Sequence, residues 1–457
     1  HLNIKKVQHQ NNLLKLKNKG ASQFQTNGEI KEYQEKEKKL LAEFSVEVYP
    51  LEGKEIFASI VPSIDGLSVK RNISITDFDG NPVPEIESFT TVLRPPQIQK
   101  DFYTSFYETH LKEIPDRLRD LLNFYIPETE RFPNFNLKKG FLRRRFGEKF
   151  ERLKRVIISG MGSAYNMSFA ARQFIETAVP KLEVLTMKPV DVENPMKIIY
   201  PEKDLVVLLS WSGTTAEIVQ FASLLKSHNV AMVAITEKFF SDLGLIAEKS
   251  GGVIATLSGE EITVSGVKST ICILFCLYLF GAWLCSRLAC EKDAFRLMKP
   301  LHEIPDKLAH LLEDQEIEKF CKELSRESAD SYVNFVVDAL NTVGTGREVA
   351  IKLEESSWSS LGKFLDYREF YIHGLKRDMN ENLVLINATH KPRLYEAIEV
   401  MKKLYLEKIP FAGITIPIRE KAQIEMFCHN RCATLPVTDP VLQPIIDFTF
   451  YYISSSP

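Results

Sequence analysis

The amino-acid sequence predicts an α/β fold with two tandem, doubly wound parallel sheets. First, short apolar segments alternate with amphipathic helical patterns from about residue 155 onward. Second, the same alternation begins again after the segment "LLEDQEIEKFCKELSRE". Third, each run has a glycine turn after its first apolar segment, "SGMGSA" in the first and "NTVGTGRE" in the second. We therefore expect a first lobe over residues 99–300 and a second lobe over residues 301–457.

The residues before these lobes form two segments of different composition. Residues 1–42 are rich in Lys, Gln, Asn and Glu, which predicts a polar, extended tail. Residues 43–98 contain "EFSVEVYP", "KEIFASIVPSI" and "SVKRNISITDF", which alternate apolar with polar residues and are separated by turn signals. This pattern predicts a small antiparallel β unit. Residues 1–28 are basic, but they lack the Arg of a mitochondrial presequence, so we expect a cytoplasmic location.

The elements of the first lobe follow one another in a regular order. After "RPPQ", helical patterns run to about residue 150. The strands are expected in "RVIIS", "LEVLTM", "DLVVLLS", "VAMVAIT" and "GVIAT", and the helices in "NMSFAARQFIETAV" and "TAEIVQFASLLKSH". The apolar stretch "TICILFCLYLFGAWLC" at 270–285 is shorter than the roughly 20 residues of a membrane span. It therefore predicts a wholly buried helix and no membrane span.

The second lobe repeats this architecture without close sequence similarity. It begins with "VNFVVDALNTVGTGREVAIKLEESSW", followed by "EFYIHG", "NLVLINA" and the helical "RLYEAIEVMKKLYLE". It then continues through "FAGITIP" and "ATLPVT" to a last helix, "VLQPIIDFTFYYIS". The chain is therefore expected to contain the same α/β architecture twice.

The composition excludes several classes of function. The formal net charge of −2 gives no electrostatic reason to expect a nucleic-acid partner. The seven cysteines are odd in number and begin only at Cys272, which indicates an intracellular protein with reduced thiols. The segment "CHNRC" has no second ligand pair at zinc-site spacing, so we expect no metal and no other cofactor.

A cluster of hydroxyl groups is the strongest local indication of a binding site. Ser210, Ser212, Thr214 and Thr215 surround Gly213 between an apolar strand and a helical pattern. One hydroxyl is enough to cap a helix, and a plain cap is the alternative interpretation. Several hydroxyls beside a helix N-terminus also suit a phosphate, because the first-turn N–H groups carry partial positive charge.

The position of this cluster strengthens the phosphate interpretation. Ligands of open α/β sheets bind at the carboxyl ends of the strands, where the strand order reverses. Both "SGMGSA" and "LSWSGTT" follow expected strands of one sheet. We therefore expect a phosphate site between these two turns.

Three motifs of the first lobe resemble those of sugar-isomerase (SIS) domains. "LLSWSGTTAE" resembles their phosphosugar loop, "GMGSAYNMSFAARQFIE" their first loop and helix, and "GEEITVSGVKSTICILFCLYLF" the segment before a long apolar helix. The order and spacing of all three fit. This resemblance implies two flavodoxin-like SIS lobes that bind a phosphosugar.

The second lobe adds a motif similar to the isomerase half of the glutamine–fructose-6-phosphate amidotransferase family. That half carries a glycine turn, then Glu-x-Ala-x-Lys-x-x-Glu on a helix, then a His-Gly pair. This chain has Glu348, Ala350, Lys352 and Glu355 at matching positions, followed by His373. The resemblance extends over about residues 100–450.

The resemblance implies a role for each matching residue. Glu355 would move a proton between C1 and C2 of the sugar. His373 would open the sugar ring, reaching across a dimer interface as in the family. The residues implied in substrate binding are Gly162, Ser163, Ser210, Ser212, Gly213, Thr215, Val264, Glu348 and Lys352. The implied assembly is a homodimer or a subunit of a larger complex.

Ordinary structural roles compete with these assignments. Glu348, Lys352 and Glu355 also fit a solvated helix face, because Glu–Lys pairs at i,i+4 spacing are common. His373 could be a loop histidine without a role in a site, and Trp211 a packing aromatic.

The chain also departs from the amidotransferase pattern. No cysteine precedes Cys272, so we expect no glutaminase activity. The family's C-terminal tail has no counterpart after "YYISSSP", "YIHGLKRDM" replaces the usual His-Gly-Pro, and Trp211 replaces a polar residue. Two hypotheses follow. One is an isomerase- or deaminase-type enzyme acting on a ketose or amino-sugar 6-phosphate. The other is a catalytically degenerate SIS protein that serves as a phosphosugar sensor or as a structural subunit.

Overall fold

The computed structural model of the chain describes two units, residues 1–99 and 100–457. The residues described in the first unit are 45–48, 56–65, 68–77 and 89–92. Those described in the second are 105–128, 130–135, 137–191, 193–263, 266–289, 291–339, 343–356, 361–373 and 382–454. The predicted tail over 1–42 therefore lies outside the described residues.

The first unit contains two antiparallel strand pairs. Strand β1 (Ser45–Val48) pairs with β4 (Phe89–Val92), and β2 (Ile56–Asp65) pairs with β3 (Ser68–Asp77). Asp65 lies opposite Ser68, so the β2–β3 pair turns at the "IDG" signal. The antiparallel strands predicted for this part of the chain are confirmed.

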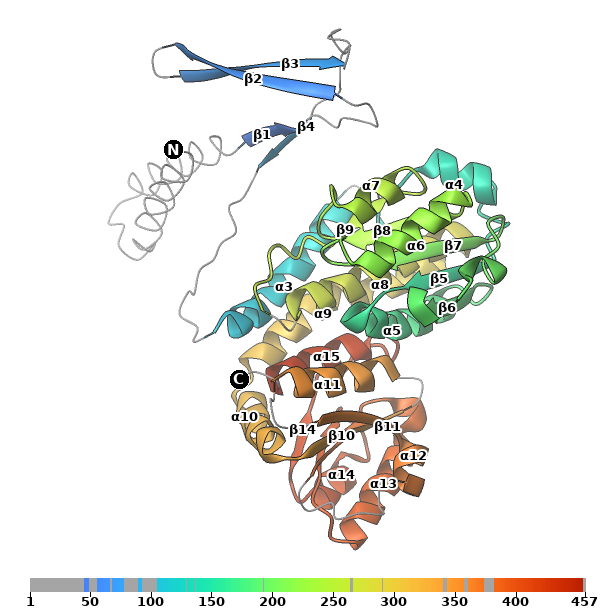
Figure 1. Cartoon of the computed structure of the whole chain (residues 1–457). Helices are drawn as coiled ribbons and strands as arrows, with labels where there is room; N and C mark the ends of the chain where they lie inside the picture. The colour runs from blue at the N-terminus through green and yellow to red at the C-terminus, as the bar shows by residue number, and fades with distance from the viewer. Residues whose placement is uncertain are drawn as a thin grey trace. The chain divides into compact units, whose positions relative to one another are not determined.

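The second unit begins with helix α3 and continues into a parallel sheet, as Figure 1 shows. The sheet order is β6-β5-β7-β8-β9, and every pairing is parallel. The strands are β5 (Arg155–Ser159), β6 (Glu183–Met187), β7 (Asp204–Leu209), β8 (Ala231–Thr236) and β9 (Val253–Ala255). In order along the chain this is 2-1-3-4-5, the flavodoxin-like order, with its switch point between β5 and β7.

Helices cover both faces of this sheet, because alternate strand residues are apolar on each side. Ile157, Val206 and Leu208 pack with α6 and α7, whereas Ile158 and Val207 pack with α5 and α8. The helices of this region are α3 (Phe106–Tyr125), α4 (Lys139–Phe146), α5 (Gly162–Ala178), α6 (Ala216–Ser227), α7 (Asp242–Glu248), α8 (Lys268–Leu288) and α9 (Glu291–Glu313). Short 3₁₀ turns lie at Pro189–Asp191 and Pro195–Lys197.

Helix α8 is the predicted buried apolar helix. Among the described residues it is the one helix long and apolar enough to cross a membrane, but 83% of its most apolar window is buried inside the protein. It packs against α3, α5, α9 and α15. The prediction of a core helix is confirmed.

The second sheet repeats the topology of the first. Its order is β11-β10-β12-β13-β14, again all parallel and again 2-1-3-4-5 along the chain. Its strands are β10 (Val333–Asp338), β11 (Leu361–Asp366), β12 (Leu383–Ala388), β13 (Ala412–Thr415) and β14 (Cys432–Thr434). Its helices are α10 (Gln315–Asp330), α11 (Val343–Ser356), α12 (Tyr367–His373), α13 (Leu394–Leu406), α14 (Lys421–Phe427) and α15 (Gln443–Ser454), with a 3₁₀ turn at Lys391–Arg393.

The segment "EFYIHG" does not supply the edge strand of the second sheet. Glu369–His373 lies in α12, and the edge strand β11 comes from "LGKFLD" just before it. An edge strand pairs on one side only and remains partly exposed, so it lacks the continuous apolar run of a central strand.

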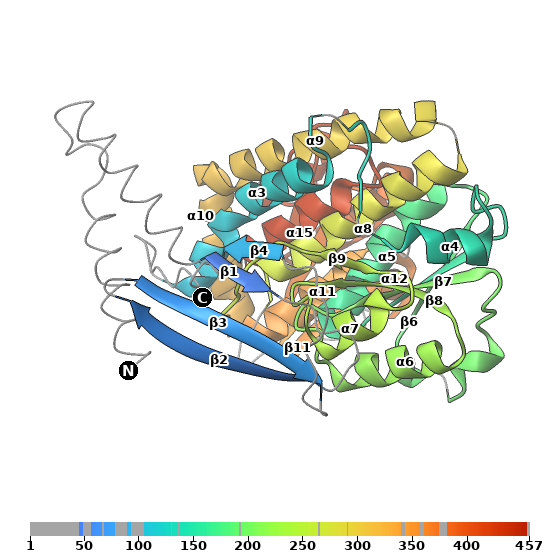
Figure 2. The ribbon, with the colours of Figure 1, turned by 90° about the horizontal axis from the view of Figure 1, so that it is seen from above.

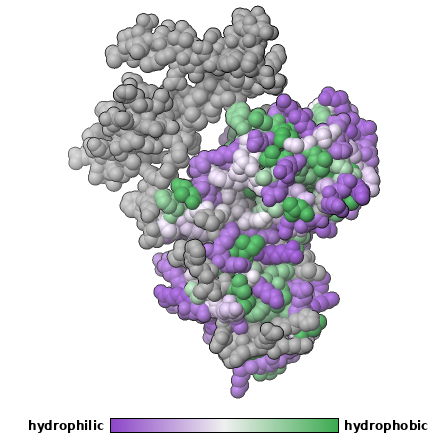
Figure 3. Space-filling model, in the orientation of Figure 1, coloured by the Kyte–Doolittle hydropathy of each residue, from purple (hydrophilic) through white to green (hydrophobic). Residues whose placement is uncertain are grey.

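The two lobes meet through their helical layers. In Figure 1, α5 of the first lobe lies against α11 of the second, and α15 runs alongside α11 and α8. Figure 2 shows α3, α8, α9 and α15 as one helical layer seen from above. One continuous apolar core includes residues of both sheets and of these helices. On the face drawn in Figure 3, by contrast, hydrophobic residues lie in small groups among polar ones.

Candidate functional site

A pocket opens at the carboxyl edge of the first sheet, at its switch point. Its volume is about 310 Å³. The residues around it are Met161, Ser163, Ala164, Leu209, Ser210, Trp211, Ser212, Thr215, Glu261, Thr263, Gly266, Ser269, Thr270 and Ile273. They come from the turn after β5, the loop after β7, and the segment that leads into α8. The hydroxyl-rich loop therefore faces a cavity.

The loop after β7 is held by its own hydroxyl groups. Ser210 Oγ accepts a 3.1 Å hydrogen bond from the Gly213 amide and lies 2.9 Å from Thr215 Oγ1. Ser212 Oγ accepts hydrogen bonds from the amide and the hydroxyl of Thr214. Gly213 has a φ of +64°, and a Cβ there would lie 1.8 Å from Ser241 Oγ. This turn therefore requires glycine.

Two helices present their N-termini at the pocket without a side-chain cap. Helix α5 begins after Met161, and α6 begins after Thr215, and neither of these cap residues makes a capping hydrogen bond with its side chain. Thr215 pairs with Ser210 instead. First-turn N–H groups that no side chain caps carry partial positive charge and attract an anion. The plain-cap alternative is therefore the weaker account of these hydroxyls.

Trp211 forms one wall of the pocket in a fixed orientation. Its Nε1 donates a 3.0 Å hydrogen bond to Ser258 Oγ, and Lys238 Nζ lies 5.4 Å from the centre of its ring. Ser258 is held in turn by Glu237, whose carboxylate accepts from the Ser258 amide and from the Gly259 amide. The indole therefore makes an apolar wall beside the hydroxyl groups.

Glu261 caps the third helix at the pocket. Its carboxylate accepts hydrogen bonds from the amides of Val267, Lys268 and Ser269 at 2.7, 3.0 and 2.9 Å. It is the one charged side chain among the described residues that line the pocket. The N-terminus of α8 is thus neutralised within the chain, which leaves those of α5 and α6 for a ligand anion.

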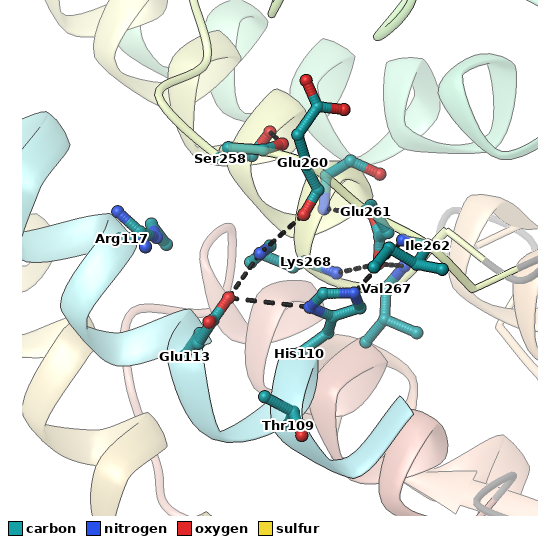
Figure 4. A network of polar contacts seen from close by, with 12 residues as sticks. Thr109, His110, Glu113, Arg117, Ser258, Glu260, Glu261, Ile262, Val267 and Lys268 are labelled. Atoms are coloured by element: carbon teal, nitrogen blue, oxygen red, sulfur yellow. Dashed lines mark hydrogen bonds and ion pairs between the residues drawn. The ribbon is translucent and has the colours of Figure 1, made fainter. Parts of the chain in front are cut away.

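Helix α3 anchors the segment that carries Glu261, as Figure 4 shows. His110 Nε2 accepts a 3.2 Å hydrogen bond from the Ile262 amide. Lys268 Nζ pairs with Glu113 and donates a 3.1 Å hydrogen bond to the backbone oxygen of Glu260. Burial works against the charged form of Glu113, but its interactions with His110 and Lys268 outweigh burial and lower its pKa to about 2. This wall of the pocket therefore rests on a charged network.

Helix α11 brings Glu348, Lys352 and Glu355 together on one face, as their spacing implies. Lys352 Nζ lies 2.8 Å from Glu355 Oε2 and 3.6 Å from Glu348 Oε1. Glu348 and Lys352 are buried, whereas the side chain of Glu355 is 34% exposed. This face of α11 is therefore buried at Glu348 and Lys352 and accessible only at the Glu355 carboxylate. The alternative of a solvated helix face does not fit.

Tyr107 relates this junction to the pocket. Burial raises the pKa of Tyr107 well above its ordinary value, and the negative charges of Glu261, Glu355 and Glu348 raise it further. One of these carboxylates lines the pocket and the other two belong to α11. Glu355 itself is not among the described residues that line the pocket.

The structure does not test the roles implied for His373 and Val264. His373 ends α12, which packs on the face of the second sheet opposite to α11. Its predicted reach across a dimer interface remains a prediction. Val264 lies outside the described residues.

Several pocket residues are absent from the sequence-based assignment. Glu261, Thr263, Ser269 and Thr270 line the wall that faces the hydroxyl loop. The segment "GEEITVSGVKST" contains all four. Its hydroxyl content is the signal that could have identified them, and the resemblance already implied Val264 of the same segment in substrate binding.

Comparisons with known proteins agree with this architecture. Residues 149–282, which carry β5 to β9 and most of α8, match the family described as SIS domain. The glutamine–fructose-6-phosphate aminotransferase (isomerizing) of Gloeobacter violaceus is 24% identical over 429 residues, covering 86% of this chain and 64% of the relative. The chain spans 33 to 64% of the length of three such curated relatives.

Two solved structures share the fold of both lobes. The C-terminal domain of glucosamine-fructose-6-phosphate aminotransferase from Francisella tularensis has a TM-score of 0.67 at 17% identity, covering 78% of this chain and 96% of that chain. Tagatose-6-phosphate ketose/aldose isomerase from Escherichia coli has a TM-score of 0.58 at 17% identity, covering 79% of this chain and 95% of that chain. Residues 149–282 thus match a SIS domain, as the motifs of the first lobe predicted.

Proposed function

We propose that this chain binds a sugar 6-phosphate and interconverts its aldose and ketose forms. The observation that carries the proposal is the pocket between the turns after β5 and β7. It combines hydroxyl groups with two helix N-termini that no side chain caps. The named relatives are aminotransferases and isomerases of phosphosugars, which supports the same class of ligand.

The phosphate would bind at Ser163, Ser210, Ser212 and Thr215. Such a site holds a dianion with hydroxyl and amide donors, so it needs no lysine or arginine. The binding energy of the phosphate would then position the sugar carbons for reaction.

Glu355 would be the base that moves the proton between C1 and C2. A carboxylate must come within about 3 Å of each proton to do so. Its partial exposure fits this role. Lys352 Nζ lies 2.8 Å from this carboxylate and pairs with it. Ring opening by His373 of a second copy completes the proposal.

The proposal is tested by incubating the protein with fructose 6-phosphate in deuterated water. Proton NMR would then report deuterium at C1 or C2 and the appearance of the aldose. Glucosamine 6-phosphate in a parallel sample distinguishes a neutral from an amino-sugar substrate. Binding without exchange in both samples would contradict the enzymatic proposal.

Phosphosugar binding without turnover is the second candidate. One observation favours it: Lys352 and Glu348 are buried and paired, and Glu355 is not among the described residues that line the pocket. Such a protein would sense a phosphosugar or act as a subunit of a larger assembly. Calorimetric titration with fructose 6-phosphate, read beside the exchange experiment, separates the two candidates, because a sensor binds the sugar and exchanges nothing.

A further inference from the structure

The junction between α11 and the pocket contains a buried tyrosine that the proposed mechanism does not use. Tyr452 belongs to α15 and is 1% exposed. Its hydroxyl donates a 3.0 Å hydrogen bond to Glu348 Oε1, 104 residues away in the sequence. Burial raises the pKa of Tyr452 well above its ordinary value, and Glu348 raises it further, so this phenol stays protonated and donates.

Tyr452 is also held through its backbone. Its backbone oxygen accepts a 2.9 Å hydrogen bond from the hydroxyl of Tyr107, which belongs to α3. Tyr452 is therefore fixed at its hydroxyl by Glu348 and at its backbone by the first helix of the lobe.

Glu348 connects Tyr452 to Lys352, one turn further along α11. Its Oε1 is shared between the Tyr452 hydroxyl and Lys352 Nζ, at 3.0 and 3.6 Å. Lys352 then makes the closer contact, 2.8 Å, to Glu355. A lysine has a flexible four-carbon stem, so its position depends on which acceptors are fixed around it. With Oε1 occupied by Tyr452, Lys352 favours Glu355.

We propose that Tyr452 is a positioning residue for the base Glu355. It would hold Glu348, and through Glu348 it would hold Lys352 against Glu355. The proposal rests on the proposed function, since it concerns the residue that would move the proton. It goes beyond that function in assigning a role to a residue of α15, which contributes neither to the described lining of the pocket nor to the carboxylates of α11.

The variant Tyr452→Phe tests this proposal, because it removes the hydroxyl and keeps the ring. Lys352 would then be drawn toward the unshared Glu348 oxygen, and Glu355 would lose its fixed partner. We expect kcat for exchange of the fructose 6-phosphate protons to fall about 10- to 100-fold, the loss typical of misplacement by about 1 Å. KM should change less than about twofold, because the phosphate contacts stay intact.

The matched control is Tyr278→Phe. Tyr278 is also buried, and its hydroxyl has no hydrogen-bond partner among the described residues. It packs on Phe174 of α5. We expect this variant to keep both kcat and KM. Equal losses in the two variants would mean a general packing effect and would overturn the proposal, as would an unchanged kcat in Tyr452→Phe.

A second measurement keeps the proposal testable if the chain has no turnover. The carboxyl ¹³C signal of Glu355, assigned with Glu355→Gln, is recorded on ligand-free protein. We expect Tyr452→Phe to shift this signal and Tyr278→Phe to leave it in place. Absence of exchange in the wild type would count against the proposed function alone. A Glu355 signal unchanged by Tyr452→Phe would count against the positioning role, whether or not exchange is seen.

Discussion

Asn166 Nδ2 donates a 2.9 Å hydrogen bond to Glu348 Oε2 across the junction of the two lobes. Both side chains are buried, and 182 residues separate them in the sequence. Ser163, one helical turn earlier in α5, lines the pocket. The helix that presents its N-terminus to the pocket therefore also holds Glu348 of α11 in the second lobe.

Glu348→Ala should destabilise the protein strongly. The change leaves Lys352 buried with one anionic partner fewer and removes the acceptor of Asn166 and Tyr452. Removing one partner of a buried pair costs about 3–5 kcal/mol. The free energy of unfolding from urea titration measures this loss.

Glu354→Ala is the control on the same helix, because Glu354 is exposed. We expect it to change the free energy of unfolding by less than about 0.5 kcal/mol. If both variants have similar stability, Glu348 is not the link between the lobes.

Ser212→Ala should weaken phosphosugar binding and leave the fold intact. Ser212 is partly exposed at the pocket, and its hydroxyl would donate to the phosphate. Loss of a charge-assisted hydrogen bond costs about 1–3 kcal/mol, which is about a 5- to 150-fold rise in Kd for fructose 6-phosphate. Calorimetric titration measures the change. Ser223→Ala, on the exposed side of α6, should bind like the wild type; an equal effect in both variants would argue against a phosphate at this loop.

Asp447 predicts a pH dependence of stability. Burial raises its pKa to about 6, although hydrogen bonds from Thr389, Gln443 and Asn387 oppose the shift. The unfolded chain releases this proton at about pH 4. Between these values the folded state holds more protons than the unfolded state, so the free energy of unfolding falls as pH rises from about 4 to about 6.

Asp447 alone should lower the free energy of unfolding by on the order of 3 kcal/mol over this pH range. The variant Asp447→Asn should remove this pH dependence. Urea unfolding of both proteins between pH 4 and pH 7 isolates the effect, because other groups titrate alike in both. The difference between the two free energies should change steadily up to about pH 6 and stay constant above it. Parallel curves over the whole range would show that the carboxyl is not buried as described.

The sequence was sufficient for features that depend on neighbouring residues. The order of strands and helices follows from apolar periodicity, and the loop after β7 follows from hydroxyl density at the end of one apolar strand. The edge strand β11 was missed because only one of its sides is paired and its residues are partly exposed. It lacks the signal on which strand prediction depends.

The rest of the site depends on contacts that periodicity cannot reveal. In the sequence, Tyr452 is one of several aromatic residues of the apolar last helix. Asn166 is a polar residue of an amphipathic helix. Their partner Glu348 is more than 100 residues from each. Only the packing of α5 and α15 against α11 brings these side chains together.

The central claim is that Glu355 moves the proton, and Glu355→Gln tests it most directly. The variant keeps the shape and hydrogen-bonding capacity of the side chain but lacks the base. In deuterated water, the wild type should exchange a C1 or C2 proton of fructose 6-phosphate. The variant should exchange it about 10²–10⁴-fold more slowly with nearly unchanged affinity. Exchange at the wild-type rate in Glu355→Gln, or a wild type that binds the sugar and exchanges no proton, would contradict the account.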